Sequence, residues 1–384
     1  MLTSGINFIG FKKKAKISSV KKKLQTILEE NNQVIKSLSS NYKNSFNKKQ
    51  VKKYKKILNY RVIGMGGSTL GTQAIYDFLK DKIKKKFLFY DNLKPSIKKN
   101  EKKKFINLIV SKSGNTIETI VNFNILIKKK DRNIFITENK KSYLYLLAEK
   151  LKAEIIHHNN YIGGRYSVLS EVGMLPAELM GLSSDDFKQF NFLIKNKNFI
   201  NSLISNVSST LYFIKNKKFN SIIINYDEKS ENLFKWYQQL VAESLGKKKK
   251  GLLPIISSMP KDNHSVMQLY LDGFQNNFYT FFYSHENKLV KINNNQLLQS
   301  KNHLRNKDLS KIIFAQKKAT ENVFKKKNIP FRSFEIKKRN EKTLGELFCF
   351  FILETILIGR SLNLNPYDQP AVELIKKETK KLLI

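Results

Sequence analysis

Residues 61–71 read RVIGMGGSTLG, in which a short β-branched run passes through a glycine-rich loop into an amphipathic stretch. The same order recurs at 106–119, where INLIV runs into SKSGNTIET. Short apolar runs, roughly one per 20–30 residues and alternating with helical patterns, are typical of βαβ units. Three more candidate strands lie at 87–91, 133–137 and 154–158. We therefore expect a doubly wound parallel sheet with helices on both faces.

A second series of the same kind follows. Its candidate strands and helices lie at 221–227, 252–257, 277–285 and 330–336, and at 231–246, 310–326 and 343–362. Two such sheets suit a chain of 384 residues, because domains commonly hold roughly 100–200 residues. The predicted class is α/β, with two αβα sandwiches and helical additions at both ends. The predicted divisions are a mainly helical segment 1–58, a first domain 59–185, a second domain 186–364 and a C-terminal helix 365–384.

The composition indicates a chain that folds around a core, since 41% of its residues are hydrophobic and 11% are aromatic. Cys349, the one cysteine, lies in the apolar run LFCFFIL, so we predict a buried thiol and no intrachain disulfide. The N-terminal residues lack the features of a secretory signal, and glutamates interrupt the longest apolar stretch, 344–359. We therefore expect no membrane segment and a cytoplasmic location.

The charge is strongly unbalanced, with 71 Lys and Arg against 31 Asp and Glu, a formal net charge of +40. A basic chain can indicate a nucleic-acid partner. Only 7 of the basic residues are Arg, however, whose planar group suits base and phosphate recognition. The 64 lysines are spread in short runs, such as those at 12–14, 84–86, 128–130 and 247–250. We interpret them as a solvated coat, with nucleic-acid binding as the lesser alternative.

The first glycine-rich loop, GMGGSTLG at 64–71, is a candidate anion site. Glycines at a strand-to-helix turn let backbone N–H groups approach an anion where the helix dipole favours negative charge. A tight turn without a ligand is one alternative, and a dinucleotide fingerprint is another. The fingerprint wants a glycine where Thr69 stands, although Asp91 at the end of the next strand can mimic the ribose-binding acid.

The loop at 111–119 strengthens the anion hypothesis, because it adds a cluster of short hydroxyl side chains and a lysine. The hydroxyls belong to Ser111, Ser113, Thr116 and Thr119, and the positive charge to Lys112. One Ser or Thr is enough to cap a helix, so four exceed that need. In an open parallel sheet, loops at the carboxyl ends of the strands meet at the switch point. We therefore expect Ser68 and the 111–116 loop to bind one phosphate group.

The stretch IGGRYSVLSEVG at 162–173 follows the fifth predicted strand. Its paired glycines permit close backbone approach, and Arg165 offers a permanent positive charge. A solvent-exposed loop arginine is the alternative interpretation. His157 and His158 lie next to each other in the preceding strand and therefore point to opposite faces, so they cannot readily share an ion. We predict no metal site and no cofactor.

Six ordered motifs resemble the phosphoglucose isomerase family. They are GMGGSTLG, SKSGNTIET, GGRYSVLS, QLVAES at 239–244, NHSVMQ at 263–268 and NPYDQPAVELIKK at 365–377. The resemblance implies two sugar-isomerase (SIS) domains, a substrate pocket between them and a homodimer with pockets at its interface. It also implies reversible conversion of glucose 6-phosphate and fructose 6-phosphate through a cis-enediolate, in glycolysis and gluconeogenesis.

The same resemblance implies a role for each matching residue. Glu243 would be the base that moves the proton, with Gln239 binding the same sugar one helical turn away. His264 would open the sugar ring, supplied from the neighbouring subunit, and Lys376 would act at the same step. Arg165 would stabilise the enediolate. The phosphate would be held by Gly67, Ser68, Ser111, Lys112, Ser113 and Thr116.

The chain departs from the family pattern in two places. Ala371 and Ile375 stand where glycines are expected in the last motif. Gly114 and Asn115 stand where many members carry other residues, and GNT in this loop is similar to the bifunctional phosphoglucose and phosphomannose isomerases. Use of mannose 6-phosphate is therefore one alternative, and a non-catalytic sugar-phosphate-binding regulator is another. The lysines outside Lys112 and Lys376 are assigned no chemistry, although their field can steer an anionic substrate.

Overall fold

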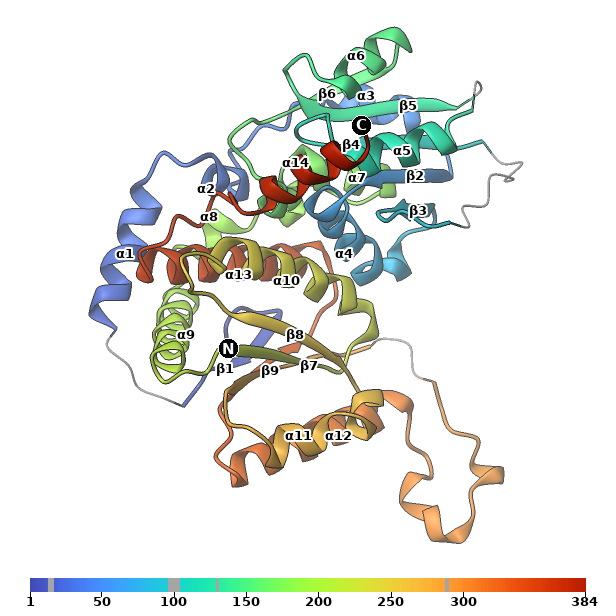
Figure 1. The fold of residues 1–384 in the computed structure, drawn as a ribbon. Helices are drawn as coiled ribbons and strands as arrows, with labels where there is room; N and C mark the ends of the chain where they lie inside the picture. Colours follow the sequence, from blue (N-terminus) through green and yellow to red (C-terminus); the bar gives the residue numbers. More distant parts are fainter. Residues whose placement is uncertain (13–16, 96–103, 129–130, 287–289) are drawn as a thin grey trace.

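The structure is a computed structural model that describes residues 1–12, 17–95, 104–128, 131–286 and 290–384. Two five-stranded sheets lie one above the other, with helices between them and on their outer faces (Figure 1). The lysine runs at 12–14 and 128–130 extend partly outside the described residues.

The first sheet is entirely parallel, in the order β3-β2-β4-β5-β6. Its strands are β2 (Asn59–Gly64), β3 (Lys86–Tyr90), β4 (Ile106–Val110), β5 (Arg132–Glu138) and β6 (Glu154–His158). Each lies within two residues of its predicted range, so the prediction of a doubly wound sheet is confirmed. The chain passes from β2 outward to β3 and then back across β2 to β4, which places the switch point between β2 and β4.

Side-chain alternation along these strands places a helix layer on each face of the first sheet. Ile63, Ile109 and Phe135 face the outer helices α5 (Ile117–Leu126) and α6 (Tyr143–Lys150). Their neighbours Val62 and Leu108 face the central core instead. The inner helices are α4 (Leu70–Phe78) and α7 (Glu171–Met180).

The second sheet has the order β1-β10-β9-β7-β8. The predicted strands are β7 (Asn220–Asn225), β8 (Leu253–Ser258), β9 (Asn277–Ser284) and β10 (Phe331–Ile336), all parallel. Its edge strand, β1 (Ile6–Ile9), pairs with β10 in the antiparallel direction. The prediction of a mainly helical segment 1–58 did not include β1, because four residues carry too short an alternation to read. That segment's helices are α1 (Ser18–Glu29), α2 (Gln33–Leu38) and α3 (Lys48–Tyr54).

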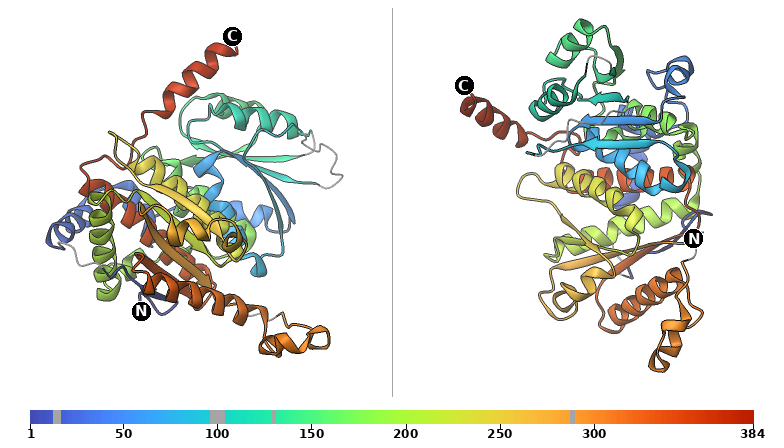
Figure 2. Two further views of the ribbon diagram at one scale, coloured as in Figure 1. Left: turned by 60° about the horizontal axis from the view of Figure 1, so that its bottom comes forward. Right: turned by 90° about the vertical axis from the view of Figure 1, so that its right-hand side faces the viewer.

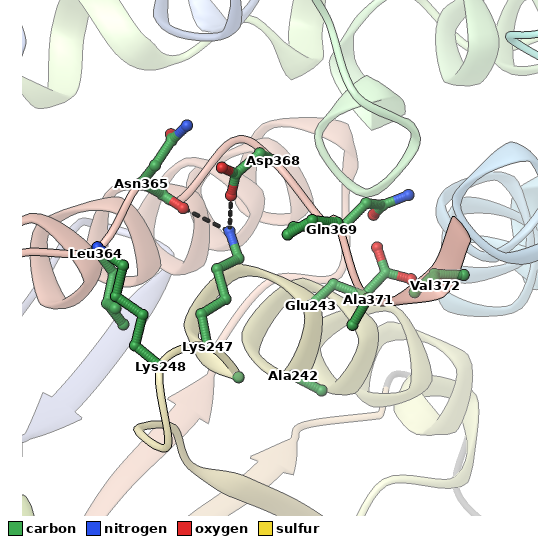
Figure 3. A pocket seen from close by; sticks show the side chains of 12 residues that line it. Ala242, Glu243, Lys247, Lys248, Leu364, Asn365, Asp368, Gln369, Ala371 and Val372 are labelled. Atoms are coloured by element: carbon green, nitrogen blue, oxygen red, sulfur yellow. Dashed lines mark hydrogen bonds and ion pairs between the residues drawn. The ribbon is translucent and has the colours of Figure 1, made fainter. Parts of the chain in front are cut away.

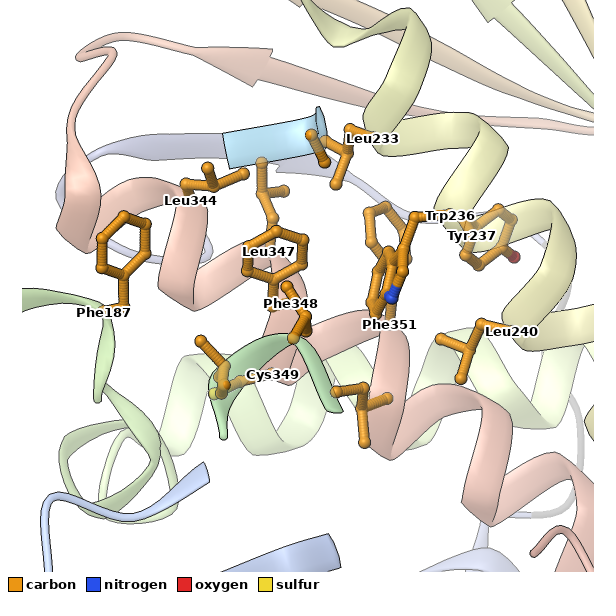
Figure 4. Close-up of a cluster of buried hydrophobic side chains, with 14 of the residues drawn as sticks. Phe187, Leu233, Trp236, Tyr237, Leu240, Leu344, Leu347, Phe348, Cys349 and Phe351 are labelled. Atoms are coloured by element: carbon orange, nitrogen blue, oxygen red, sulfur yellow. The ribbon is translucent and has the colours of Figure 1, made fainter. Parts of the chain in front are cut away.

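The core lies between the two sheets and is centred on α13 (Glu341–Ser361), which is buried from Thr343 to Gly359 on all sides. Figure 4 shows its aromatic and aliphatic side chains against Trp236 and Leu240 of α10 (Glu231–Leu245). Cys349 lies in this cluster, so its predicted burial is confirmed, and burial raises the pKa of its thiol to about 12. Four further helices are α8 (Phe190–Leu193) and α9 (Lys197–Lys215), and α11 (Met267–Asp272) and α12 (Leu309–Lys326) on the outer face of the second sheet.

The last helix, α14 (Val372–Leu382), projects away from the body of the molecule (Figure 2). It has an apolar side, yet Leu374 and Ile375 are 66% and 69% exposed. Over the parts of the chain that the structure describes, no helix has the length and apolar character to cross a membrane.

Candidate active site

The switch point of the first sheet brings the two predicted anion loops, 64–71 and 111–119, together. Gly64 and Val110 are direct partners at the carboxyl ends of β2 and β4, so the loops after them start side by side. The first loop folds as a short 3-10 turn, Gly66–Ser68, in which Gly66 has a φ of +54°. Gly67 lies against the backbone of Gly164, where an added Cβ would be 2.2 Å from the carbonyl carbon. This contact joins the GMGGS loop to the GGRYS loop.

Three of the four predicted hydroxyl residues, Ser111, Ser113 and Thr116, lie before the first residue of α5, whereas Thr119 is buried within the helix. Ser111 Oγ and Thr116 Oγ1 are 3.0 Å apart, and Thr116 makes no side-chain cap to the helix amides. Ser113 is exposed, and Lys112 Nζ lies 3.4 Å from Glu138 Oε1. Uncapped amides, hydroxyls and a lysine at a helix start are suited to a phosphate.

Arg165 lies at the centre of the candidate site and is buried, in the 3-10 segment Gly164–Leu169, with 2% of its side chain exposed. The alternative of a solvent-exposed loop arginine is therefore wrong. Its Nε donates to Ser244 Oγ at 2.8 Å, and its Nη2 donates to the carbonyls of Pro366 at 2.7 Å and Asp368 at 3.0 Å. Its Nη1 donates to Gln369 Oε1 at 2.6 Å and to Glu243 Oε2 at 3.3 Å. All five N–H groups of the guanidinium are thus engaged.

Glu243 and Gln239 lie on one face of α10, as predicted from their spacing. Gln239 Nε2 donates to Glu243 Oε1 at 2.8 Å, while Arg165 contacts the other carboxylate oxygen. Gln239 also lies against Gly66, and its own Oε1 is buried without a hydrogen-bond partner. Two donors therefore fix the orientation of the Glu243 carboxylate, and a buried acceptor is left available beside it.

Glu243 opens onto a pocket of about 560 Å³ between the end of α10 and the loop 364–372 (Figure 3). Lys247 Nζ lies at its rim and donates to Asn365 O at 2.5 Å and Asp368 Oδ1 at 2.6 Å. This hydrogen bond lowers the pKa of Asp368. The pocket is lined by Ala242, Glu243, Gly246, Lys247, Lys248, Leu364, Asn365, Asp368, Gln369, Pro370, Ala371 and Val372.

The interpretation of nearly all lysines as a solvated coat needs correction. Lys247 belongs to the run 247–250 but ties α10 to the pocket loop, with only 11% of its side chain exposed. Lys188 is buried and donates to backbone carbonyls of Ser37 and Leu169. Lys317 is fully buried on α12, 2.8 Å from Glu321. Spacing along the chain does not reveal which members of a lysine-rich sequence turn inward.

The structure does not bring His264 or Lys376 to the pocket. His264 is exposed in the 3-10 segment Lys261–His264. Lys376 is on the projecting helix α14, where 59% of its side chain is exposed and its Nζ lies 2.6 Å from Glu373. Within one chain, the site therefore unites Arg165, Gln239 and Glu243 with the two anion loops but leaves these two residues apart.

Several residues of the site were not predicted individually. Tyr166 Oη is 2.8 Å from Ser244 Oγ and donates to Pro366 O at 2.9 Å, and Trp236 Nε1 donates to Arg165 O at 3.1 Å. Burial raises the pKa of Tyr166. Tyr166 and Ser244 each follow a predicted site residue within a motif, and this adjacency is the one feature of the sequence that could have indicated them. Their role as supports of Arg165 depends on contacts between segments about 80 residues apart or more.

Comparison with known proteins places these features in a family. The profile described as Phosphoglucose isomerase matches residues 12–383. A protein named glucose-6-phosphate isomerase from Methanocaldococcus jannaschii is 33% identical over 347 residues, which cover 85% of each chain. One of the same name from Mycoplasmopsis pulmonis is 31% identical over 84% of this chain and 82% of its own.

Solved structures share the fold. A hypothetical protein of Thermus thermophilus superposes with a TM-score of 0.81 at 22% identity, covering 96% of this chain and 94% of its own. A glucose-6-phosphate isomerase from Chlamydia trachomatis superposes with a TM-score of 0.74 at 16% identity, covering 96% and 84%.

Proposed function

Because the chain belongs to the phosphoglucose isomerase family, we propose that it interconverts glucose 6-phosphate and fructose 6-phosphate in glycolysis and gluconeogenesis. The observation that supports this most directly is the Glu243 carboxylate. It is partly exposed to the pocket, and one donor on each oxygen fixes its orientation. Aldose-ketose isomerisation needs one such base within reach of two adjacent carbons.

In the proposed reaction, Glu243 removes the proton from carbon 2 of the open-chain aldose, which gives a cis-enediolate. The protonated carboxyl then returns that proton to carbon 1. The hydroxyl hydrogen of oxygen 2 is transferred to oxygen 1, so that the carbonyl moves from carbon 1 to carbon 2. Gln239 supports this assignment, because its buried and unpaired Oε1 beside Glu243 can accept a hydrogen bond from a sugar hydroxyl.

The phosphate would bind at the switch point. Backbone N–H groups near Gly67 and the start of α5 lie on adjoining loops, together with the side chains of Ser68, Ser111, Lys112, Ser113 and Thr116. A phosphate held there would anchor the substrate while carbons 1 and 2 lie near Glu243. Its dianionic charge would complement both the helix start and the lysine.

The proposed role of Arg165 is to orient Glu243 and to provide a fixed positive charge beside the enediolate. All five of its N–H groups are engaged within the chain, so its position is set before the substrate binds. A preorganised charge stabilises a developing anion without a reorganisation cost.

We also propose that the working enzyme is a cytoplasmic homodimer in which a second copy supplies His264. The exposure of His264 and its separation from the Glu243 pocket support this arrangement. The exposed apolar residues of α14 support a protein contact that would also place Lys376. Mixing two inactive variants, Glu243→Gln and His264→Ala, should regenerate activity if one site needs residues from two copies. Continued inactivity of a mixture that forms mixed dimers would contradict the shared site.

The activity is tested by a coupled assay of fructose 6-phosphate conversion. We expect an active wild type and a fall in kcat of about 10²- to 10⁴-fold for Glu243→Gln. The matched control is Glu231→Gln, at the start of the same helix, where 42% of the side chain is exposed, and this variant should retain full activity. An inactive wild type would refute the proposal, and binding without conversion would favour the regulator alternative. The same assay with mannose 6-phosphate tests the bifunctional alternative, which conversion of that sugar would favour.

A further inference from the structure

A buried polar cluster lies directly behind the segment that carries Arg165, and the proposed reaction does not use it. His158 is the last residue of β6 and is 3% exposed. Its Nδ1 lies 2.6 Å from Glu171 Oε1, and its Nε2 lies 3.0 Å from the carbonyl oxygen of Ile162. Glu171 is the first residue of α7 and is 1% exposed.

Both ring nitrogens of His158 face acceptors. A neutral imidazole has one N–H, so it can donate to one of these oxygens and must direct a lone pair at the other. The imidazolium satisfies both contacts, since each of its nitrogens carries a hydrogen. As an imidazolium, the ring would also form an ion pair with the Glu171 carboxylate. The attraction between the two opposite charges offsets the desolvation cost of each.

The surroundings of Glu171 agree with an ionised carboxylate. Besides His158, its Oε1 accepts from the amide N–H of Asn159 at 2.9 Å, and its Oε2 accepts from Tyr42 Oη at 3.0 Å. Burial raises the pKa of Glu171, but the hydrogen bond and charge of His158 and the Asn159 amide outweigh it, so the pKa lies below its usual value. Burial and Glu171 raise the pKa of Tyr42, which keeps its hydroxyl a donor. Lys188 is a further charged group at this cluster, and its Nζ lies 4.9 Å from the Tyr42 ring centroid.

Ile162 lies three residues before Arg165, so the His158 contact holds the start of the GGR segment. The next residues in that segment have little room to shift. Gly164 lies against Gly67 of the anion loop, and Arg165 orients Glu243. A displaced Ile162 would therefore disturb the phosphate loop and the base together.

We propose that His158, as an imidazolium between Glu171 and Ile162, is a positioning residue that sets the Gly163–Arg165 segment for the isomerase reaction. The inference rests on the proposed function. It assigns His158 no contact with the substrate. Its effect reaches the chemistry only through the backbone of the segment and the Arg165 side chain.

The kinetic test compares His158→Asn with His157→Asn. His157 is the neighbouring residue on the opposite face of β6, exposed and stacked at 6.3 Å on Tyr145, which makes it a matched control. We expect His158→Asn to lower kcat by about 10- to 100-fold, because small misplacements remote from the reacting atoms have effects of this size. His157→Asn should leave kcat unchanged. A folded His158→Asn variant with the kcat of an active wild type would overturn the inference, whatever its melting temperature.

A second measurement needs no variant. In ¹⁵N-histidine-labelled wild type, His158 is the one buried ring among the five histidines, so its N–H protons should exchange slowest. We expect both of its nitrogens to carry the chemical shift of an imidazolium, because each faces an oxygen acceptor. A neutral ring in the assay buffer would overturn the inference even if His158→Asn fails to fold. An inactive wild type with an imidazolium at His158 would refute the proposed function instead, and would leave this buried pair established.

Discussion

Replacement of Gly67 by alanine tests the contact that joins the anion loop to the Arg165 segment. The new Cβ would lie 2.2 Å from Gly164 C, 2.4 Å from Gly164 O and 2.5 Å from Arg165 N. These are backbone atoms, so no side chain can rotate away, and the two segments must separate. Overpacking of this kind costs about 1–3 kcal/mol.

The matched control is Gly164→Ala, on the other side of the same contact. A Cβ there would lie 3.7 Å from Gly67 Cα and 3.9 Å from Gly67 C, which is ordinary van der Waals distance. The two substitutions add the same methyl group to two adjoining glycines. The structure nevertheless predicts damage from one and tolerance of the other.

Two assays measure this difference. Urea denaturation should give a free energy of unfolding about 1–3 kcal/mol lower for Gly67→Ala and close to wild type for Gly164→Ala. In steady-state kinetics, if about 1.4 kcal/mol of the clash is relieved by displacing the phosphate loop, KM for fructose 6-phosphate rises about tenfold. Equal effects of the two substitutions, or a Gly67→Ala enzyme like the wild type, would refute the reasoning.

Three further outcomes are expected. Lys247→Ala removes the hydrogen bonds to Asn365 O and Asp368, so KM should rise severalfold, whereas Lys249→Ala, an exposed member of the same run, should match the wild type in the coupled assay. Burial lowers the pKa of Lys188 from 10.5 to about 8. Between about pH 8 and pH 10.5, the unfolded chain therefore holds a proton on Lys188 that the folded chain has lost. The free energy of unfolding should therefore rise by up to about 3 kcal/mol from about pH 8 to about pH 10.5, and denaturation of Lys188→Met should lack that rise. If the +40 charge steers an anionic substrate, kcat/KM should fall as salt increases from about 0.01 to about 0.15 M, and a flat profile would contradict steering.

The strands of both sheets were predictable because each is a short apolar run bounded by turn residues, and parallel strands that are buried on both faces leave this pattern clearly in a sequence. β1 was not predictable in the same way. Its four residues pair with β10, more than 300 positions away, so they form a strand only where the edge of the second sheet offers a partner. The helix α13 was predicted from its apolar run, and its two buried glutamates find partners that are remote in sequence. Glu346 accepts from Thr3 at 2.7 Å, and Glu354 pairs with Arg332.

The candidate site likewise combines features set by the local sequence with features set by tertiary contacts. The residue types of the anion loops and the i, i+4 spacing of Gln239 and Glu243 were readable locally, because a loop composition and a helix face are local properties. The sequence did not predict that all five N–H groups of Arg165 are hydrogen-bonded, because their acceptors lie in α10 and in the loop 366–369, far away in the chain.

By itself, then, the sequence determined the parallel strands of both sheets, the candidate base and the composition of the candidate phosphate loops, all of which follow from short-range patterns. Only the tertiary structure decided which glycine is sterically required, which lysines turn inward and how His158 faces two acceptors at once. It also separated His264 and Lys376 from Glu243 within one chain. These features depend on distances between segments that are far apart in the chain. No local spacing sets such distances, because packing of the whole core fixes them.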